Sequence, residues 1–367
     1  MNNIHRYIDS IHISNHSILG NLDINLINPQ TGQPYSIVAF VGENGCGKTT
    51  LLNELSKLKD YNHVFIRQNS MFVGAVNETY KIITGSEYPY PVSNNINNKD
   101  AQLFSNKEKV SPILEELDDK VLIDIFNSDK LDNSRCAART MKAIDGKDNV
   151  FDLDTLSSGQ QELLLKLKDL KNANAKTDFV LLDEPETSLH PRWQLKIIDV
   201  IQRLLSREDG VHPQIFIATH SEKILESILK REDSLIIRLY KNDKNEIKHE
   251  DISEMNLILP RVTLAELDYL IFKIDSFEYC SQLYDLIEWR TQKSERRIDT
   301  LIRNSKFYNN ELHYKEWFNE HFKDVSAKNI ATYCRNYFHH PKDRVEPTKK
   351  ELHDAIELLR NVILNLI

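Results

Sequence analysis

Several features that would restrict the class of this protein are scarce or missing from its sequence. No run approaches the roughly 18 apolar residues that a membrane-spanning helix needs, and residues 1–6 lack the apolar core of a signal peptide. Cysteine is rare, and no two cysteines form a C-x-x-C pair: the four are Cys46, Cys136, Cys280 and Cys334. Neither a disulfide framework nor a zinc knuckle is therefore indicated. We expect a protein of the reducing cytoplasm with no membrane partner.

An excess of basic residues is also missing. The 367 residues include 47 Lys and Arg against 55 Asp and Glu, a net charge of −8. From Arg261 to the end the two signs balance at 17 each, which leaves 30 against 38 in residues 1–260. The composition does not indicate a general nucleic-acid-binding face, although these totals are compatible with a local basic groove.

One stretch organises the chain. Residues 42–49 read GENGCGKT and fit the phosphate-binding pattern G-x-x-x-x-G-K-[ST]. An apolar run at 36–41 predicts a buried strand before it, and the leucines after it recur at helical spacing: Leu51, Leu52, Leu55 and Leu58. The glycines let the backbone fold around an anion, so that amide hydrogens and the helix N-terminus face phosphate oxygens. Lys48 is expected to bridge the β- and γ-phosphates of a nucleotide, and the Thr49 hydroxyl to bind Mg²⁺.

Polar residues follow two further runs that predict buried strands. Residues 179–182 lead into Asp183-Glu184, and residues 215–218 lead into Thr219 and His220. The carboxyl ends of such strands meet at one edge of a sheet, where sheets of this kind bind ligands. Alone, Asp183-Glu184 would be an ordinary turn and His220 a structural histidine; the phosphate loop favours a functional role for both.

The rest of the first 260 residues gives weaker signals. Alternating residues at 8–13 and 22–26 predict antiparallel strands that lead into the core. Residues 64–66 predict a strand that runs into a polar loop with Gln68. Residues 86–109 are poor in apolar side chains and predict an exposed excursion, and residues 240–246 predict a hairpin turn.

The pattern becomes helical from about Arg261. Helices are predicted at 264–272, 279–289, 312–322 and 330–338. A last helix is predicted after Pro347, because Thr348 and Glu351 form a Thr-x-x-Glu capping box.

Taken in order, these motifs and the segment 156–161 (LSSGQQ) resemble the motif set of ABC-type ATPases over roughly residues 1–240. The resemblance implies ATP and Mg²⁺, held between two copies of the chain. It assigns ATP contacts to Asn44, Gly45, Cys46, Gly47, Lys48, Thr49, Thr50, Gln68, Ser157, Ser158, Gly159 and Gln160. Ser157 and Gly159 would contact ATP of the opposite subunit, and Ser158 stands where the commonest signature has Gly. On local sequence alone this segment is also a helix N-cap.

The resemblance also implies the catalytic and metal-binding roles. Thr49, Gln68 and Asp183 would hold Mg²⁺, Asp183 through water. Glu184 would polarise the attacking water, since phosphoryl transfer depends on positioning and charge. His220 matches the switch histidine that contacts the γ-phosphate. The predicted role of Gln68 depends only on its place in a loop that follows a predicted strand.

Two regions separate subfamilies. Residues 186–191 (ETSLHP) replace the Ser-Ala-Leu-Asp-like turn of transporter ATPases and resemble the overcoming-lysogenization-defect, RecF and SMC side of the superfamily. Only 107 positions separate Thr49 from Leu156, too few for the long coiled coils of SMC proteins. The helical tail of PtuA-type ATPases of Septu and retron antiphage systems is similar to residues 262–272, 276–279, 283–284 and 335–341 and to the capped last helix. That resemblance implies an HNH nuclease partner (PtuB-like) and, for a retron, a reverse transcriptase with its msDNA.

Three alternatives remain. Arg335 and His340 fit the R-x(4–6)-H spacing of the helical HEPN ribonucleases, in which His acts as acid/base and Arg binds phosphate; the other interpretation is a helix end that packs or binds a partner. A RecF-like DNA-repair ATPase is the second, with nucleic acid as its partner. A transporter ATPase subunit is disfavoured by the turn at 189–191 and the long helical tail.

We therefore predict an α/β fold: an ABC-ATPase head with an antiparallel β lobe, a parallel-sheet core and a helical lobe, followed by an α-helical C-terminal region. The predicted domains are 1–260, with an insertion at about 75–150, and 261–367. The predicted function is that of a cytoplasmic, ATP-dependent dimer or higher oligomer that controls an associated antiphage nuclease.

Overall fold

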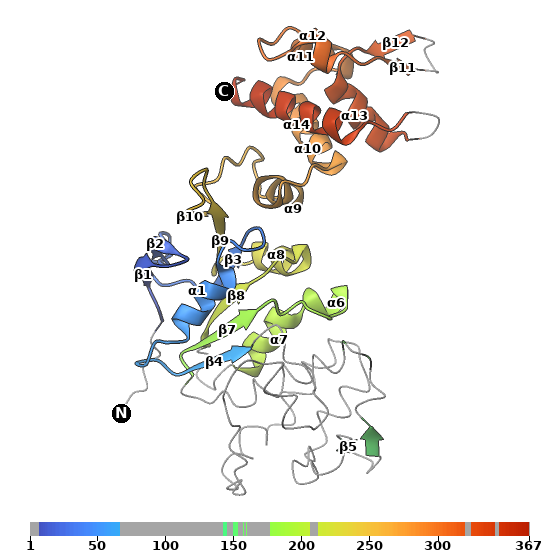
Figure 1. Ribbon diagram of the computed structural model, residues 1–367. Coiled ribbons are helices and arrows are strands. Elements are labelled where there is room, and N and C mark those ends of the chain that lie inside the picture. The colour runs from blue at the N-terminus through green and yellow to red at the C-terminus, as the bar shows by residue number, and fades with distance from the viewer. Residues whose placement is uncertain are drawn as a thin grey trace, which may run out of the picture. The chain divides into compact units, whose positions relative to one another are not determined.

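The chain divides into two compact units, Met1–Asp251 and Ile252–Ile367, in a computed structural model (Figure 1). The structure describes residues 7–66, 142–144, 150–152, 157, 159, 177–205, 212–319, 324–341 and 345–366. The predicted insertion at about 75–150 lies almost entirely outside the described residues, as does Gln68. Among the described residues, no helix is long and apolar enough to cross a bilayer.

A six-stranded sheet forms the centre of the first unit. Its strands, in spatial order, are β10 (Ile247–Asp251), β9 (Ser234–Lys241), β3 (Ile37–Val41), β8 (Gln214–Ala218), β7 (Phe179–Asp183) and β4 (His63–Ile66). All neighbours pair in parallel except β10, which returns antiparallel to β9 through the predicted hairpin turn. Every residue of β3, β7 and β8 is buried, as expected for central strands covered on both faces.

Helix α1 (Lys48–Leu55) packs on β7 and β8, and α8 (Glu222–Leu229) packs on β3 (Figure 1). One hydrophobic core joins alternate residues of the strands to the buried Leu51, Leu52 and Leu55 of α1. Leu58 was predicted for the same face, but α1 ends at Leu55 and Leu58 is 36% exposed. Two further helices follow β7: α6 (Pro191–Gln194) and α7 (Ile197–Leu204).

The predicted N-terminal strands are confirmed as an antiparallel hairpin, β1 (Ser10–His16) with β2 (Gly20–Asn25), in the register Ile11 to Ile24 and Ile13 to Leu22. Its apolar side chains join the core on α1. A second small antiparallel pair consists of β5 (Lys142–Ile144) and β6 (Val150–Asp152).

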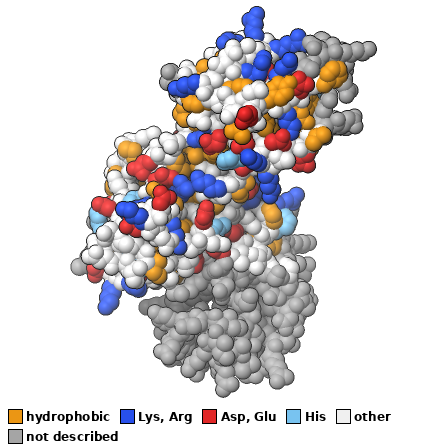
Figure 2. Space-filling view, turned by 45° about the horizontal axis from the view of Figure 1, so that its top comes forward, with side chains coloured by type: hydrophobic (Ala, Val, Ile, Leu, Met, Phe, Trp, Pro, Cys, Tyr) orange, Lys and Arg blue, Asp and Glu red, His pale blue; other side chains and the backbone are white. Residues whose placement is uncertain are grey.

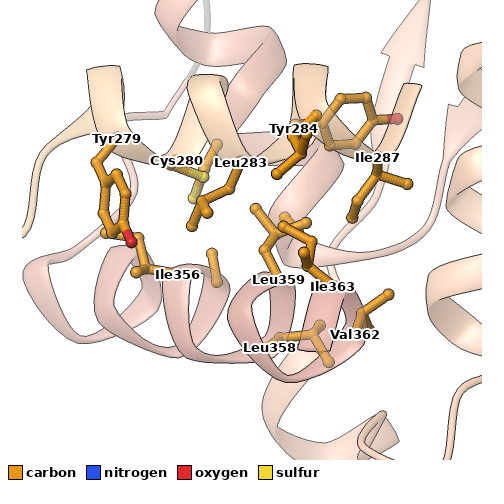
Figure 3. Close-up of a cluster of buried hydrophobic side chains, with 14 of the residues drawn as sticks. Tyr279, Cys280, Leu283, Tyr284, Ile287, Ile356, Leu358, Leu359, Val362 and Ile363 are labelled. Carbon is orange, nitrogen blue, oxygen red and sulfur yellow. The ribbon is translucent and has the colours of Figure 1, made fainter. Parts of the chain in front are cut away.

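The second unit is mainly helical. Its helices are α9 (Leu264–Leu267), the π-helix η4 (Asp268–Phe272), α10 (Phe277–Thr291), α11 (Glu295–Arg303), α12 (Asn310–His313), α13 (Ile330–His339) and α14 (Lys349–Leu364). Its core lies mainly between α10, α13 and α14; Figure 3 shows Leu283 of α10 facing Leu359 of α14. The predicted Thr348–Glu351 capping box starts α14.

One predicted helix of this unit is wrong and another was missed. Residues 312–322 were predicted as a helix, but α12 ends at His313, and β11 (Trp317–Asn319) pairs antiparallel with β12 (Asp324–Ala327). Trp317 is buried edge-on against Tyr333 of α13, with ring centroids 5.3 Å apart, so tertiary packing overrides the helical pattern. Helix α11 was not predicted, because only a narrow apolar stripe, buried at Ile298 and Ile302, marks it. The α/β class and the helical C-terminal region are confirmed.

Candidate nucleotide-binding site

The loop between β3 and α1 has the backbone of a phosphate cradle. Gly42, Gly45 and Gly47 have φ of 139°, 78° and 91°, values that side chains strongly disfavour. A Cβ on Gly42 would lie 2.1 Å from the carbonyl oxygen of Leu239 in β9, so no other residue fits there without moving that strand. This loop delivers the chain into α1 at Lys48, where helix N-terminal amides are available to an anion.

Lys48 is buried at the mouth of the loop, 6% exposed. Its Nζ donates to the carbonyl oxygens of Gly42 at 2.9 Å and Glu43 at 3.1 Å. Burial lowers the pKa of Lys48, while the Cys46 thiol and the Glu184 carboxylate oppose that shift. The ammonium is therefore held by the loop at the place where phosphate would be recognised.

Thr49 and Asp183 meet although 134 positions separate them. The Thr49 hydroxyl, at the start of α1, donates to Asp183 Oδ1 at the end of β7 over 2.9 Å. Among the described residues no group of three His, Cys, Asp or Glu side chains could enclose a metal ion. A hydroxyl beside a carboxylate fits Mg²⁺, which keeps several waters and takes its other ligands from phosphate.

Glu184 and His220 face one another across the ends of β7 and β8. His220 Nε2 lies 3.6 Å from Glu184 Oε1. Glu184 adopts a left-handed φ of 46°, and its amide donates to the Ala218 carbonyl oxygen over 2.8 Å. Burial and then the charge of Lys48 lower the pKa of His220, while Glu184 opposes them. The structure thus brings Lys48, Thr49, Asp183, Glu184 and His220 to one edge of the sheet.

The residues of the loop and of the first turn of α1 that were predicted to contact ATP differ in their exposure. Asn44, Gly45 and Thr49 are exposed, whereas Cys46 and Gly47 are buried and Thr50 is half-buried. The first group is the part of the loop open to a ligand, and the second anchors it: a Cβ on Gly47 would lie 2.7 Å from Leu19 of the N-terminal hairpin.

The signature segment is only partly described. Ser157 is exposed, and Gly159 packs so closely on the turn after β7 that a Cβ there would lie 2.6 Å from the Ser188 carbonyl oxygen. Ser158 and Gln160 lie outside the described residues, and the sequence-based prediction for them stands untested.

Glu186 is a residue of this edge that sequence reasoning did not place in the site. Its Oε1 accepts from the Thr219 hydroxyl at 2.8 Å and from the His220 amide at 2.9 Å. Burial raises the pKa of Glu186, and these hydrogen bonds oppose the shift. A third acid after a buried strand, in Asp-Glu-Pro-Glu, was the available signal, but only the pairing of β7 with β8 shows its partner.

Arg335 lies on α13 of the second unit, and His340 is the C-cap residue of that helix. The guanidinium of Arg335 stacks over Tyr284 at 5.6 Å from the ring centre and donates to the Asn336 side chain at 3.0 Å. His340 is exposed at the C-terminal end of the helix, and its neighbour His339 contacts the hydroxyl of buried Ser281 over 3.1 Å. The contacts of Arg335 are with its own helical unit.

The surface charge agrees with the composition. On the face drawn in Figure 2, Lys and Arg side chains are interspersed with Asp and Glu over the described residues. The described part of that face carries no extended basic patch of the kind that binds a nucleic-acid backbone.

Comparison with known families adds sequence matches to this geometry. The family model described as "AAA domain, putative AbiEii toxin, Type IV TA system" matches residues 77–226. The phosphate import ATP-binding protein PstB 3 of Streptococcus pneumoniae serotype 4 is 26% identical over 193 residues, which cover 50% of this chain and 70% of that protein. PstB of Mycoplasma mobile is 25% identical over 198 residues, 50% of this chain and 62% of that protein.

Two solved structures are also similar. The ATP binding subunit of an ABC transporter is 12% identical, with 67% of this chain and 88% of that chain covered and a TM-score of 0.33. An SMC head bound to the C-winged helix domain of ScpA is 12% identical, with 68% and 99% covered and a TM-score of 0.33. The chain is thus similar in sequence to ATP-binding proteins over about half of its length, and in the structure its phosphate loop and the acids that end β7 meet at one edge of the sheet.

Proposed function

We propose that the chain binds ATP with Mg²⁺ at this edge of the sheet and hydrolyses it. The observation that carries the proposal is the Thr49–Asp183 hydrogen bond, which joins the phosphate loop to the acidic end of β7. Lys48 lies buried on the same loop, and Glu184 follows Asp183 with His220 3.6 Å away. One edge therefore offers a cation and amide hydrogens for phosphate, oxygen ligands for a metal, and a carboxylate for water.

Each residue has one task in this proposal. Lys48 would exchange its hydrogen bonds to the loop carbonyls for bonds to phosphate oxygens, and Thr49 and Asp183 would hold Mg²⁺. When bound, Mg²⁺ neutralises charge that develops on the phosphates. Glu184 orients and polarises the attacking water, and the neutral imidazole favoured by the lowered pKa of His220 can donate a hydrogen bond from Nε2.

Phosphate release from ATP tests this proposal. Wild type should turn over in Mg²⁺ and stop in excess chelator, and Lys48→Ala should lose about two orders of magnitude or more in kcat/KM, because the loop loses its cation. Lys57→Ala is the matched control, since Lys57 is an exposed lysine paired with Glu54 just beyond α1. Equal rates for Lys48→Ala and wild type would refute the proposal.

We further propose that two copies close around ATP, with Ser157 and Gly159 of one copy facing the nucleotide of the other. The support is the resemblance of this segment to the ABC signature, together with the exposure of Ser157. Sedimentation of Glu184→Gln, which retains ATP in this account, should show a dimer with ATP and a smaller species without it. A sedimentation coefficient independent of ATP would contradict the proposal.

The biological role we propose is control of an antiphage nuclease. The support is the PtuA-like sequence of the helical unit and the transporter-unlike turn at 186–191. The chain would act with an HNH nuclease (PtuB-like), and in a retron setting with a reverse transcriptase and msDNA. Co-expression with an HNH protein encoded by a neighbouring gene should reduce the number of phage plaques. Lys48→Ala should abolish this protection, whereas Lys57→Ala should keep it. Protection that survives Lys48→Ala would refute this role.

A further inference from the structure

Glu186 is the acid at the sheet edge to which the proposed chemistry gives no task. It lies two residues after Glu184, in the turn that follows β7. Through Oε1 it accepts one hydrogen bond from the Thr219 hydroxyl and one from the His220 amide. A single carboxylate oxygen therefore joins the segment that contains Glu184 to the segment that contains His220, although 34 positions separate Glu186 from His220.

These bonds determine where the His220 backbone lies. Thr219 is fully buried, and its hydroxyl also accepts from the Ser221 amide at 3.0 Å, so residues 219–221 are all tied to this one carboxylate. His220 projects from that segment toward Glu184. A shift of the segment would move the imidazole relative to the carboxylate proposed to act on water.

A second connection joins the same two segments. Ser221 donates its hydroxyl hydrogen to Gln194 Oε1 at 2.7 Å, and Gln194 Nε2 donates to the Leu189 carbonyl oxygen at 2.9 Å. Gln194 ends α6, directly after the turn at 186–191. The turn and the 219–221 segment are thus held together at two points, of which Glu186 is the one next to the imidazole.

The burial of Glu186 carries a cost in stability that its hydrogen bonds must account for. Glu186 Oε2 is buried and has no hydrogen-bond partner among the described residues. A buried acceptor without a partner lowers stability, and such groups call for an explanation. The bonds to Thr219 and His220 both use Oε1, so they account for the burial of Glu186 at this place, and Oε2 is the oxygen that is left without a partner.

We propose that Glu186 is a positioning residue for ATP hydrolysis: it fixes His220 against Glu184 without touching the nucleotide. This inference rests on the proposed function. It predicts that the geometry of hydrolysis, not the affinity for ATP, depends on an acceptor at the position of Oε1.

Two variants of Glu186 and one control test the proposal. Glu186→Ala removes both bonds and should lower kcat by about tenfold to a hundredfold, because misplacement of a reacting group by about 1 Å costs that much. The KM for ATP and the affinity for a fluorescent ATP analogue should change less than about threefold, because no phosphate contact is lost. Glu186→Gln keeps an acceptor at Oε1 and should restore kcat to within about threefold of wild type. Glu226→Ala, a half-buried glutamate of α8 that pairs with Lys223 and Lys230, should behave like wild type.

Amide hydrogen exchange gives a second measurement that does not depend on turnover. Exchange in the peptide that contains His220 should accelerate in Glu186→Ala, whose amide acceptor is missing, and not in Glu186→Gln. The peptide that contains α1 should be unchanged in both variants.

Three results would overturn the inference: wild-type kcat in folded Glu186→Ala, an equal loss of kcat in Glu186→Ala and Glu186→Gln, or a loss confined to KM. If Glu186→Ala does not fold, Glu186→Asp shortens the side chain by one methylene and should show the same fall in kcat; wild-type kcat there would overturn the inference. Absent turnover in wild type refutes the proposed function instead, and the exchange experiment then decides whether Glu186 holds His220.

Discussion

Replacement of Gly42 by alanine tests whether the phosphate loop depends on β9 as the structure shows. Gly42 has φ of 139°, and a strained backbone of this kind costs roughly 1–3 kcal/mol for a residue with a side chain. The new Cβ would also lie 2.1 Å from the Leu239 carbonyl oxygen, one residue beyond the last pair of β3 with β9, Val41 with Arg238. Backbone cannot rotate away as a side chain can, so overpacking adds about 1–3 kcal/mol.

The expected loss in the free energy of unfolding is therefore about 2–6 kcal/mol, a large part of the roughly 5–15 kcal/mol of a typical domain. Urea unfolding followed by circular dichroism measures it. Gly45→Ala is the matched control from the same loop: its φ is 78°, but no atom lies within 4 Å of the new Cβ, so only about 1–2 kcal/mol of backbone strain is expected. If Gly42→Ala is no less stable than Gly45→Ala, the close approach of β9 to the loop is wrong.

Three further predictions concern other parts of the chain. Thr348→Ala removes the capping box of α14 and should lower the free energy of unfolding by about 1 kcal/mol. Urea unfolding measures this loss, with Thr300→Ala in the middle of α11 as the control. An unchanged free energy of unfolding would show that Thr348 does not cap the helix. Burial raises the pKa of Glu186 above 4.5, so its stabilising contribution is complete below that pH and is lost as pH rises through the folded-state pKa. The free energy of unfolding of Glu186→Gln relative to wild type should therefore rise between pH 4 and pH 8 in urea titrations. A difference that does not change with pH would refute the raised pKa of Glu186. Purified protein should leave tRNA intact, because Arg335 is engaged by Tyr284 and Asn336; cleavage that His340→Ala abolishes would establish the ribonuclease alternative.

The sequence was most informative where a local pattern and its neighbours agree. The strand before residue 42, the glycines and the helix after residue 47 are contiguous, so their roles could be predicted without knowledge of the tertiary fold. The polar residues that end or follow β7 and β8, Asp183 and His220, could be predicted for the same reason, because four consecutive apolar residues mark each buried strand.

Contacts between distant segments could not be predicted in this way. Glu186 acquires its partners only because β8 pairs beside β7, and nothing local to residue 186 specifies Thr219. Residues 312–322 carry a helical pattern, yet the burial of Trp317 on Tyr333 stabilises a strand there. In both cases tertiary packing, which a single sequence does not display, decides the outcome.

The most direct test of the central claim is the rate of phosphate release by Glu184→Gln, measured together with its affinity for ATP. If the acids at the end of β7 catalyse hydrolysis, Glu184→Gln should bind ATP as tightly as wild type. Its turnover should be at least about a hundredfold slower, because the amide cannot act as a base toward water. Glu184→Gln that hydrolyses ATP at the wild-type rate would show that Glu184 is not the catalytic carboxylate and would contradict the account.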